Sequence, residues 1–340
     1  MKTTYVVLII AASILSGSSA LAETGRAGQA GDFMKFGLGA RPLGMGSAFA
    51  GIAEGIDGIY YNTAGIAFAT HKQVGLTYHS LSLDRNLNSA AVMSPVRNEA
   101  VLAFSWINSS VGNVLMRDSD RNPAGEFRNS TNAFALSFAK AASERFAFAG
   151  NLRYYTSRLD ELTSSTVGAD LGAMLRFAGR QGPSEKFAAG LAIQDIGSNH
   201  RWDSGAYWSN NEGSDYTDRF PLRIRGGMSA SLLENTLITA VDIVQIQHLT
   251  PKFHAGAEYW FVKQVNVEVP EAEYESEEAR TTQVQNRVLG LRAGYDDGSL
   301  TFGASLYYPY GEVNGGLDYA FVSGKRGLDA THVFTVRLIY

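Results

Sequence analysis

The chain has six histidines, the residue type that most often acts in acid-base catalysis or binds metal ions. Their spacing matches no recognisable catalytic or metal site. No His-Glu-x-x-His zinc motif occurs, and no histidine stands at a familiar spacing from an acid and a nucleophilic serine. The chain has no cysteine, which excludes disulfides, cysteine-ligated metals and thiol catalysis. We therefore expect no catalytic residue, no metal ion and no cofactor, with a hydrolase built from serine and histidine as the alternative.

A glycine-rich block lies near the N-terminus, where Gly37, Gly39, Gly44 and Gly46 flank Arg41. The block lacks the third glycine of a dinucleotide-binding loop and the Gly-Lys-Ser/Thr end of a phosphate-binding loop, which argues against nucleotide binding. Glycines here permit positive φ angles or close contact with neighbouring backbone. A charge among apolar residues and glycines needs a partner, so we expect Arg41 to be paired.

The first residues of the chain indicate export. Lys2 precedes an apolar run from Tyr5 to Leu15, and the triplet Ala20-Leu21-Ala22 follows it. A positive residue, a short apolar run and small residues are typical of a secretory signal peptide, with cleavage after Ala22. A retained anchor is the alternative, although the run is shorter than the roughly 20 residues that a spanning helix needs. We expect residues 1–22 to be a signal peptide.

Composition excludes some partners and favours strands. The chain has 29 basic and 33 acidic residues and a net charge of −4, which gives no reason to expect nucleic acid as a partner. Its 36 Gly, 16 Tyr, 18 Phe and only 8 Pro are typical of many strands joined by turns. No later apolar stretch has the length of a transmembrane helix, so a membrane crossing must use strands closed into a barrel.

Period-two alternation recurs from about residue 73 to the last residue. Between 166 and 177, for example, Val167 and Leu171 share one face of the strand, and Asp170 and Arg176 share the other. The alternating segments number fourteen, at 73–83, 88–97, 100–108, 131–140, 145–157, 165–177, 186–196, 222–233, 236–245, 252–263, 287–296, 299–308, 313–322 and 332–340. An even number fits a closed antiparallel barrel. We predict an all-β fold, a 14-stranded antiparallel transmembrane β-barrel over residues 73–340, in the outer membrane of a Gram-negative cell.

The final strand has the form of a barrel-closing strand. Phe334, Val336, Leu338 and Tyr340 share one face, which period-two alternation turns toward lipid. The terminal tyrosine stands where an interfacial aromatic girdle lies in such barrels. We expect this strand to pair with the strand near Gln73.

The opposite faces of the strands are mostly Gly, Ala, Ser and Thr with occasional charges, which suits a crowded lumen better than an open surface. These charges have two interpretations: a network of ion pairs that holds the lumen together, or the lining of a pathway. The residues concerned are Arg153, Asp170, Arg176, Arg223, Arg225, Asp242, Glu258, Arg292 and Asp318. His79 and His254 are also expected to face the lumen.

The longer connections carry separate expectations. The stretches 109–130 and 197–221 are polar and are expected to be outer loops. The acidic stretch 264–286 falls on the periplasmic side, where turns are usually short. Either it is an acidic insertion in a periplasmic turn, which we favour, or the assignment of connections to alternate ends of the barrel is wrong at this point.

Aromatic residues form two groups. Tyr154, Tyr259, Trp260, Tyr307, Tyr308 and Tyr340 are expected in interfacial belts. A second group lies in the longest outer loop and is a candidate for gripping a ligand or a secreted partner; its members are Trp202, Tyr207, Trp208 and Tyr216.

Residues 34–46 and 62–65 carry a resemblance to a known family. The first stretch reads Met-Lys-Phe-Gly-Leu-Gly-Ala-Arg-Pro-Leu-Gly-Met-Gly and the second Asn-Thr-Ala-Gly, in which Thr63 replaces the family's proline. Both resemble the PorV/PorQ family of outer-membrane proteins, a branch of the FadL-like barrels. The matching motif residues are Gly37, Gly39, Arg41, Gly44, Met45, Gly46, Asn62 and Gly65.

The resemblance implies a barrel whose N-terminal segment, residues 23–72, folds into the lumen as a hatch. It also implies a protein that is not an enzyme, with two alternative roles. PorV-like relatives serve the type IX secretion system, beside a large translocon barrel and with secreted cargo proteins as partners. FadL-like relatives carry hydrophobic small molecules across the outer membrane. The first role is the expectation from the motif residues and the second is the alternative.

Overall fold

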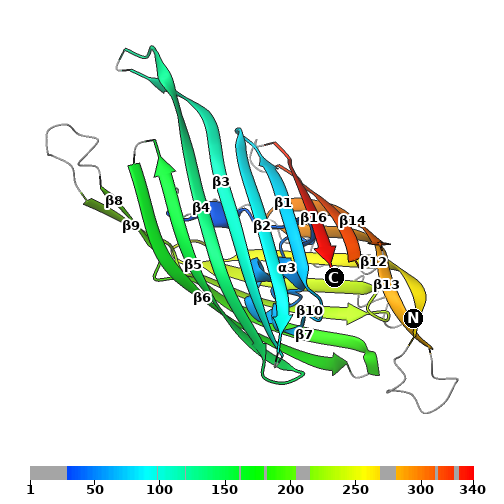
Figure 1. Ribbon diagram of the computed structural model, residues 1–340. Helices are drawn as coiled ribbons and strands as arrows, with labels where there is room; N and C mark the ends of the chain where they lie inside the picture. Colours follow the sequence, from blue (N-terminus) through cyan, green and yellow to red (C-terminus); the bar gives the residue numbers. More distant parts are fainter. Residues whose placement is uncertain are drawn as a thin grey trace.

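The computed structural model describes residues 29–97, 99–118, 120–160, 162–179, 182–203, 215–268, 281–310, 313–324 and 329–340. Within them, fourteen strands close into an antiparallel barrel, in the order β1-β16-β15-β14-β13-β12-β11-β10-β7-β6-β5-β4-β3-β2 (Figure 1). The predicted all-β, 14-stranded barrel is therefore confirmed. The expected signal peptide, residues 1–22, lies outside the described residues.

The barrel strands run from β1 to β7 and from β10 to β16, with these bounds: β1 (Gln73–Leu81), β2 (Arg85–Val96), β3 (Ala100–Arg117), β4 (Pro123–Ala141), β5 (Phe146–Leu159), β6 (Leu162–Gly179), β7 (Gly182–Ile196), β10 (Arg223–Leu232), β11 (Leu237–Ile246), β12 (Lys252–Glu268), β13 (Thr281–Asp296), β14 (Ser299–Tyr310), β15 (Val313–Val322) and β16 (Thr331–Ile339). A separate two-stranded hairpin, β8 (Asn199–Asp203) with β9 (Asp215–Arg219), lies between β7 and β10.

The strands form because large apolar and small or polar residues alternate along them. In β5, Leu152 and Tyr154 point outward and keep 59% and 46% of their surface exposed, whereas Ala149 and Arg153 point inward and are buried. The same alternation repeats around the barrel and produces a continuous outer band of Leu, Phe, Val and Tyr. Exposed apolar residues on this scale are stable only against lipid.

The barrel closes where β1 pairs with β16, with Gln73 opposite Ile339 and Ser80 opposite His332. Reciprocal backbone hydrogen bonds between Lys72 and Tyr340, at 2.9 and 3.0 Å, extend this seam by one residue. We call the end of the barrel that holds Lys72 and Tyr340 the inner end and the opposite end the outer end.

The structure corrects the loop expectation at two outer connections. Most of the stretch 109–130 is strand, because β3 extends to Arg117 and β4 begins at Pro123. The stretch 197–221 contains the β8–β9 hairpin, which projects beyond the barrel wall (Figure 1). Alternation disappears in both stretches because both faces of a strand meet water once it leaves the bilayer.

The predicted insertion at 264–286 also has different bounds. Residues 264–268 belong to β12 and residues 281–286 to β13, and these two strands pair as one hairpin, from Glu268 opposite Thr281 back to His254 opposite Asp296. The hairpin turns at the inner end, as the alternation of sides required. Residues 269–280 lie outside the described residues.

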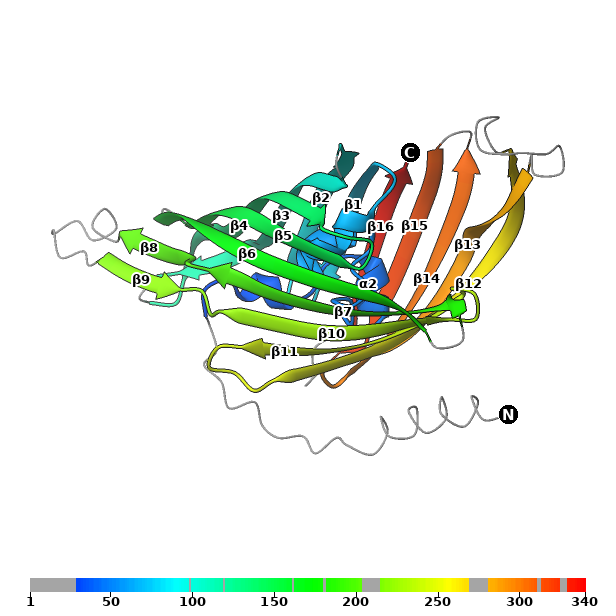
Figure 2. The ribbon, with the colours of Figure 1, turned by 90° about the horizontal axis from the view of Figure 1, so that it is seen from below.

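Residues 29–72 form the lumenal segment, which lies inside the barrel (Figures 1 and 2). It contains η1 (Asp32–Lys35), α2 (Ala40–Gly44), α3 (Gly55–Tyr61) and η2 (Thr63–Phe68). Small inward residues leave room for it: Ala139, Ala147 and Ala149 pack in one buried cluster with Ile66 of η2. Among the described residues, no helix is long and apolar enough to span a membrane.

Candidate functional site

The lumenal segment changes direction at short helices with defined ends. Gly39 precedes α2 with a φ of 83°, a left-handed conformation that an L side chain rarely adopts. Asn62 joins α3 to η2: its side chain accepts a hydrogen bond from the backbone N–H of Ala64 at 3.2 Å. Thr63, where the resembling family has proline, instead donates its hydroxyl to the carbonyl of Ile59 at 3.2 Å.

Asn62 also attaches the segment to the wall. Its Nδ2 donates to the carbonyl oxygens of Ala50 in the segment and Ala173 on β6, each at 3.1 Å. Gly65 packs directly against Ala53, so the two halves of the lumenal segment fold onto each other. One amide therefore fixes both the internal fold of the segment and its place in the barrel.

Glycines bring the backbone of the segment against the wall at the centre of the motif. A Cβ atom added at Gly46, whose φ is 63°, meets the carbonyl oxygens of Tyr295 and Ala255 at 2.4 and 2.5 Å. A Cβ added at Gly44 meets the Cα of Gly303 on β14 at 3.1 Å. The approach at Gly46 is too close for a side chain and the approach at Gly44 is tight, which explains both glycines in physical terms.

Arg41 in α2 is paired with carboxylates, as expected for a charge among apolar residues and glycines. Its Nε and Nη2 donate to both carboxylate oxygens of Glu258 on β12, at 2.9 and 2.7 Å, and its Nη1 donates to Glu54 at 3.1 Å. Arg41 is 3% exposed and Glu258 fully buried. A bidentate pair of this geometry compensates both charges in a site without bulk water.

The Arg41 pair belongs to a longer chain of alternating charges, which we call the lumenal ion network. It joins Glu258 to Arg292 at 2.5 Å, Arg292 to Asp318 at 3.7 Å, and Arg337 to Asp57 at 2.9 Å. Four arginines balance four carboxylates in it. Its members, in order of contact, are Asp57, Arg337, Asp318, Arg292, Glu258, Arg41, Glu54 and Arg287.

Three members of the network come from the lumenal segment and the remaining five from the wall. Of the two interpretations of the inner charges, the ion-pair network is therefore the one that the structure shows for Glu258, Arg292 and Asp318. Arg153 with Asp170, and Arg225 with Asp242, form further buried pairs. Arg176 instead lies over the ring of Phe68 at the end of η2, 3.8 Å from its centroid.

Asp242 on β11 binds the backbone of the segment. Its Oδ2 accepts the N–H groups of Phe49 and Ala50 at 3.0 and 2.9 Å, and Arg225 at 3.2 Å. Arg225 also donates to the carbonyl of Ser47 at 2.9 Å. Residues 47–50 are thus fixed by one ion pair of the wall.

Two segment carboxyls have shifted pKa values in opposite directions. Desolvation raises the pKa of Asp57 despite the attraction of Arg337. Desolvation also opposes ionisation of Glu54, but the charges of Arg287 and Arg41 prevail and lower its pKa to about 2.

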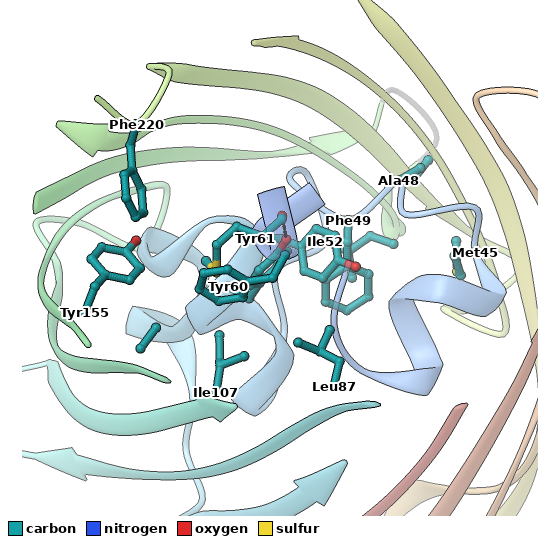
Figure 3. Packing of buried hydrophobic residues seen from close by; sticks show 14 of the residues in the cluster. Met45, Ala48, Phe49, Ile52, Tyr60, Tyr61, Leu87, Ile107, Tyr155 and Phe220 are labelled. Carbon is teal, nitrogen blue, oxygen red and sulfur yellow. Dashed lines mark hydrogen bonds between the residues drawn. The ribbon is translucent and has the colours of Figure 1, made fainter. Parts of the chain in front are cut away.

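Aromatic packing fills the centre of the lumen (Figure 3). The ring of Tyr61 contacts those of Phe49 and Tyr60 edge-on, with centroids 5.6 and 4.9 Å apart. Leu87 of β2 and Ile107 of β3 pack against them from the wall (Figure 3). The segment therefore fills the cross-section of the barrel with buried side chains.

A cavity of about 530 Å³ lies between the lumenal segment and the outer end of the barrel, and we call it the vestibule. Its apolar lining comes from the segment and from the ends of the strands: Met34, Phe36, Leu43, Leu81, Val244, Ile246, Leu249 and Val322. Its polar lining includes His79, Arg223, Arg225 and His254. The lining thus combines these apolar side chains with a larger number of polar and charged ones. A cavity of this size suits a small organic molecule.

Two of the four outer-loop aromatics, Trp202 and Tyr216, lie among the described residues. Trp202 on β8 stands opposite Tyr216 on β9, and Tyr216 is 64% exposed. Trp202 packs on His200, with ring centroids 5.4 Å apart. Tyr207 and Trp208 lie outside the described residues.

The belt expectation is wrong for Trp260 and Tyr307. Trp260 is 1% exposed and its ring contacts that of Tyr307 in the lumen, tilted by 58° at a centroid distance of 5.1 Å. The guanidinium groups of Arg41, Arg287 and Arg292 lie 5.2 to 5.8 Å from its ring. Tyr259 faces outward, so the alternation of the strand places the neighbouring Trp260 inward. There its ring contacts three arginines of the lumenal ion network.

The closing-strand residues all face outward. Phe334, Val336, Leu338 and Tyr340 keep between 44% and 51% of their surface exposed. Between them, Thr335 and Arg337 point into the lumen, where Thr335 accepts the N–H of Ala40 at 3.0 Å. The closing strand is thus also an attachment site for the segment.

Four members of the network were not predicted from the sequence: Glu54, Asp57, Arg337 and Arg287. Arg337 was recognisable as inward from the alternation of the last strand. Asp57 and Arg287 carried no such signal, because Asp57 lies in a helix and Arg287 lies at a β-bulge where the register of β12 and β13 shifts. Among the described residues, no group of three or more His, Cys, Asp or Glu is arranged to hold a metal ion.

No family model matches the chain, and no curated protein matches it. Solved structures do match. The toluene transporter TbuX of Ralstonia pickettii aligns with a TM-score of 0.54 and 12% identity, over 89% of this chain and 97% of that one. The toluene transporter TodX of Pseudomonas putida aligns with a TM-score of 0.55 and 11% identity, over the same shares. The fold is that of the toluene transporters.

This shared fold agrees with the outer surface of the barrel. A closed antiparallel barrel leaves no unpaired edge, and its apolar outer band matches the hydrocarbon layer. The chain is an integral outer-membrane barrel, as its alternation predicted.

Proposed function

We propose that the protein is a passage for hydrophobic small molecules across the outer membrane, with the lumenal segment as its hatch. It is a transporter in this proposal and not an enzyme. The vestibule carries the argument: a cavity of about 530 Å³ at the outer end, with eight apolar side chains in its lining, ends at the buried lumenal segment. The fold shared with two toluene transporters supports the same role.

Passage then requires the hatch to move. Residues 40–53 are buried, so the segment closes the lumen below the vestibule. None of residues 29–72 is a strand, and their bonds to the wall are side-chain contacts and isolated backbone contacts. The segment can therefore shift while every strand pair of the barrel stays intact.

Uptake by cells tests this proposal. We would express the protein in a Gram-negative host without its own hydrophobic channels and measure the uptake rate of 2-methylnaphthalene. Leu249→Trp narrows the vestibule and should lower the rate several-fold, whereas Leu306→Trp on the lipid-facing side, where Leu306 is 56% exposed, should not. Equal uptake with and without the protein would refute the proposal.

We propose handling of secreted proteins in a type IX secretion system as the second candidate. It rests on the motif residues of the lumenal segment and on the β8–β9 hairpin, which projects beyond the barrel with Tyr216 exposed (Figure 1). Pull-down in mild detergent with mass spectrometry distinguishes the two. Secreted proteins or a large translocon barrel in the eluate favour this candidate, and bound hydrophobic molecules favour the passage.

A further inference from the structure

His79 lines the vestibule with part of its hydrogen-bonding capacity unused. It lies on β1, lines the cavity and is 2% exposed. Its Nε2 contacts the Thr331 hydroxyl at 3.4 Å, at the long limit for a hydrogen bond, and its Nδ1 has no partner among the described residues. A buried polar atom without a partner costs free energy unless a ligand or water satisfies it.

The cross-strand neighbours of His79 are apolar. Its register partners are Leu87 on β2 and Val333 on β16. Val333 packs in one cluster with Leu43, and both Leu43 and Val322 line the vestibule. The imidazole therefore lies beside apolar side chains of the vestibule, where a single polar group can orient a largely apolar ligand.

Most of the charges around the vestibule have partners; Arg85, which donates to the Ser82 carbonyl at 3.0 Å, and the exposed Asp329 form no ion pair among the described residues. Arg223 pairs with Asp195 at 3.1 Å, and Arg225 pairs with Asp242 at 3.2 Å. Further pairs join Lys35 to Asp32, Lys252 to Asp297 and His254 to Asp296. A charged ligand would lose its hydration and meet groups most of which are already neutralised, so the cavity favours a neutral molecule.

We propose that His79 is the hydrogen-bonding subsite of the vestibule and that the ligand is a neutral, mainly apolar molecule with one hydroxyl group, of the class of phenols and alcohols. A hydroxyl both donates and accepts, so it satisfies Nδ1 in either tautomer of the imidazole. A pure hydrocarbon leaves that nitrogen unpaired. This inference rests on the proposed function and specifies the ligand of the same site.

Two ligands of nearly the same shape test it: 2-naphthol and 2-methylnaphthalene. Equilibrium dialysis of the full barrel in lipid nanodiscs, against empty nanodiscs, gives the dissociation constant of each at pH 7. The wild-type protein should prefer 2-naphthol, and His79→Leu should reduce this preference roughly three- to tenfold, the value of one hydrogen bond. His79→Asn, which keeps a polar group, should retain part of the preference.

His71→Leu is the matched control, because His71 lies exposed at the inner end, hydrogen-bonded to Thr70. Heat-modifiable migration on gels checks the assembly of each variant, and His79→Phe replaces His79→Leu if the latter does not assemble. If both ligands bind and the preference is unchanged in the apolar variant, the subsite is refuted and the passage stands. If neither ligand binds the wild-type protein above the empty nanodiscs, both proposals are wrong.

Discussion

At the scale of single residues, the buried pair of Arg41 and Glu258 joins the hatch to the wall. Both oxygens of the carboxylate are used by Arg41, and one of them also accepts from Arg292. Removal of one partner from such a pair leaves an uncompensated charge in a site that water does not reach. The pair therefore determines how firmly the hatch is seated.

Arg41→Leu should lower the free energy of unfolding by about 3–5 kcal/mol, because Glu258 loses its bidentate partner. Arg41→Lys should recover only part of this, since an ammonium group cannot form the two parallel bonds. Urea unfolding in lipid, followed by tryptophan fluorescence, measures both. Arg97→Ala, on an exposed inner turn, is the control, and an Arg41→Leu midpoint equal to that of the control would contradict the account.

The ionisation of Glu54 makes the stability of the folded protein depend on pH. Its pKa is about 2 in the folded protein against 4.5 ordinarily, so the folded state binds the proton more weakly than the unfolded state. Its stabilising contribution is complete above pH 4.5 and is lost as the pH falls toward 2. The side chain is 39% exposed, so solvent screening keeps this contribution small.

The stability difference between the wild-type protein and Glu54→Gln should therefore be constant from pH 7 to about 5 and shrink between pH 4.5 and 2. Urea unfolding at a series of pH values measures this difference. A difference that grows on acidification would show that Arg41 and Arg287 do not hold Glu54 ionised.

At the scale of elements, the hatch fits the wall through glycines on both sides of the contact. A Cβ added at Gly256 on β12 meets the backbone carbonyl oxygen of Met45 at 2.3 Å, and one added at Gly294 on β13 meets the nitrogen of Gly46 at 2.3 Å. Backbone atoms cannot give way as a flexible side chain can. The absence of side chains at Gly256 and Gly294 thus makes room for the backbone of Met45 and Gly46, just after α2.

Gly294→Ala should destabilise the seated hatch by about 1–3 kcal/mol through overpacking. Gly226→Ala on β10 is the matched control, because an added Cβ meets nothing within 4 Å there. Limited proteolysis of the barrel in lipid measures the release of the hatch. Equal resistance of the two variants to proteolysis would show that the close contact at Gly294 does not hold the lumenal segment in place.

The strands were predictable from sequence to the extent that the membrane dictates them. All fourteen barrel strands followed from alternation, because lipid on one side and a packed lumen on the other separate residues such as Leu152 and Arg153. The outer parts of β3 and β4 and the β8–β9 hairpin did not follow, because water surrounds both faces there. The sequence predicted that Arg41 has a partner. It could not predict that this partner is Glu258, because that depends on the registers of strands distant in sequence.

At the scale of the whole molecule, the barrel is a closed wall around the lumenal segment, which the proposed function treats as a movable hatch. Continuous antiparallel pairing closes the wall, and the lumenal ion network, the Asp242 contacts and the glycine contacts hold the hatch below the vestibule. The proposed passage requires these contacts to break together while the wall stays closed.

An engineered disulfide between hatch and wall tests this claim most directly. The chain has no cysteine of its own, and a Cβ added at Gly172 on β6 stands 3.5 Å from the Cβ of Ala64 in η2, within disulfide range. A cysteine at 172 also displaces Asn62, so reduction of the same variant is the matched control. In cells that express Ala64→Cys/Gly172→Cys, uptake of 2-methylnaphthalene should fall to background when the pair is oxidised and return on reduction. Equal uptake in the two states would contradict a hatch that must move.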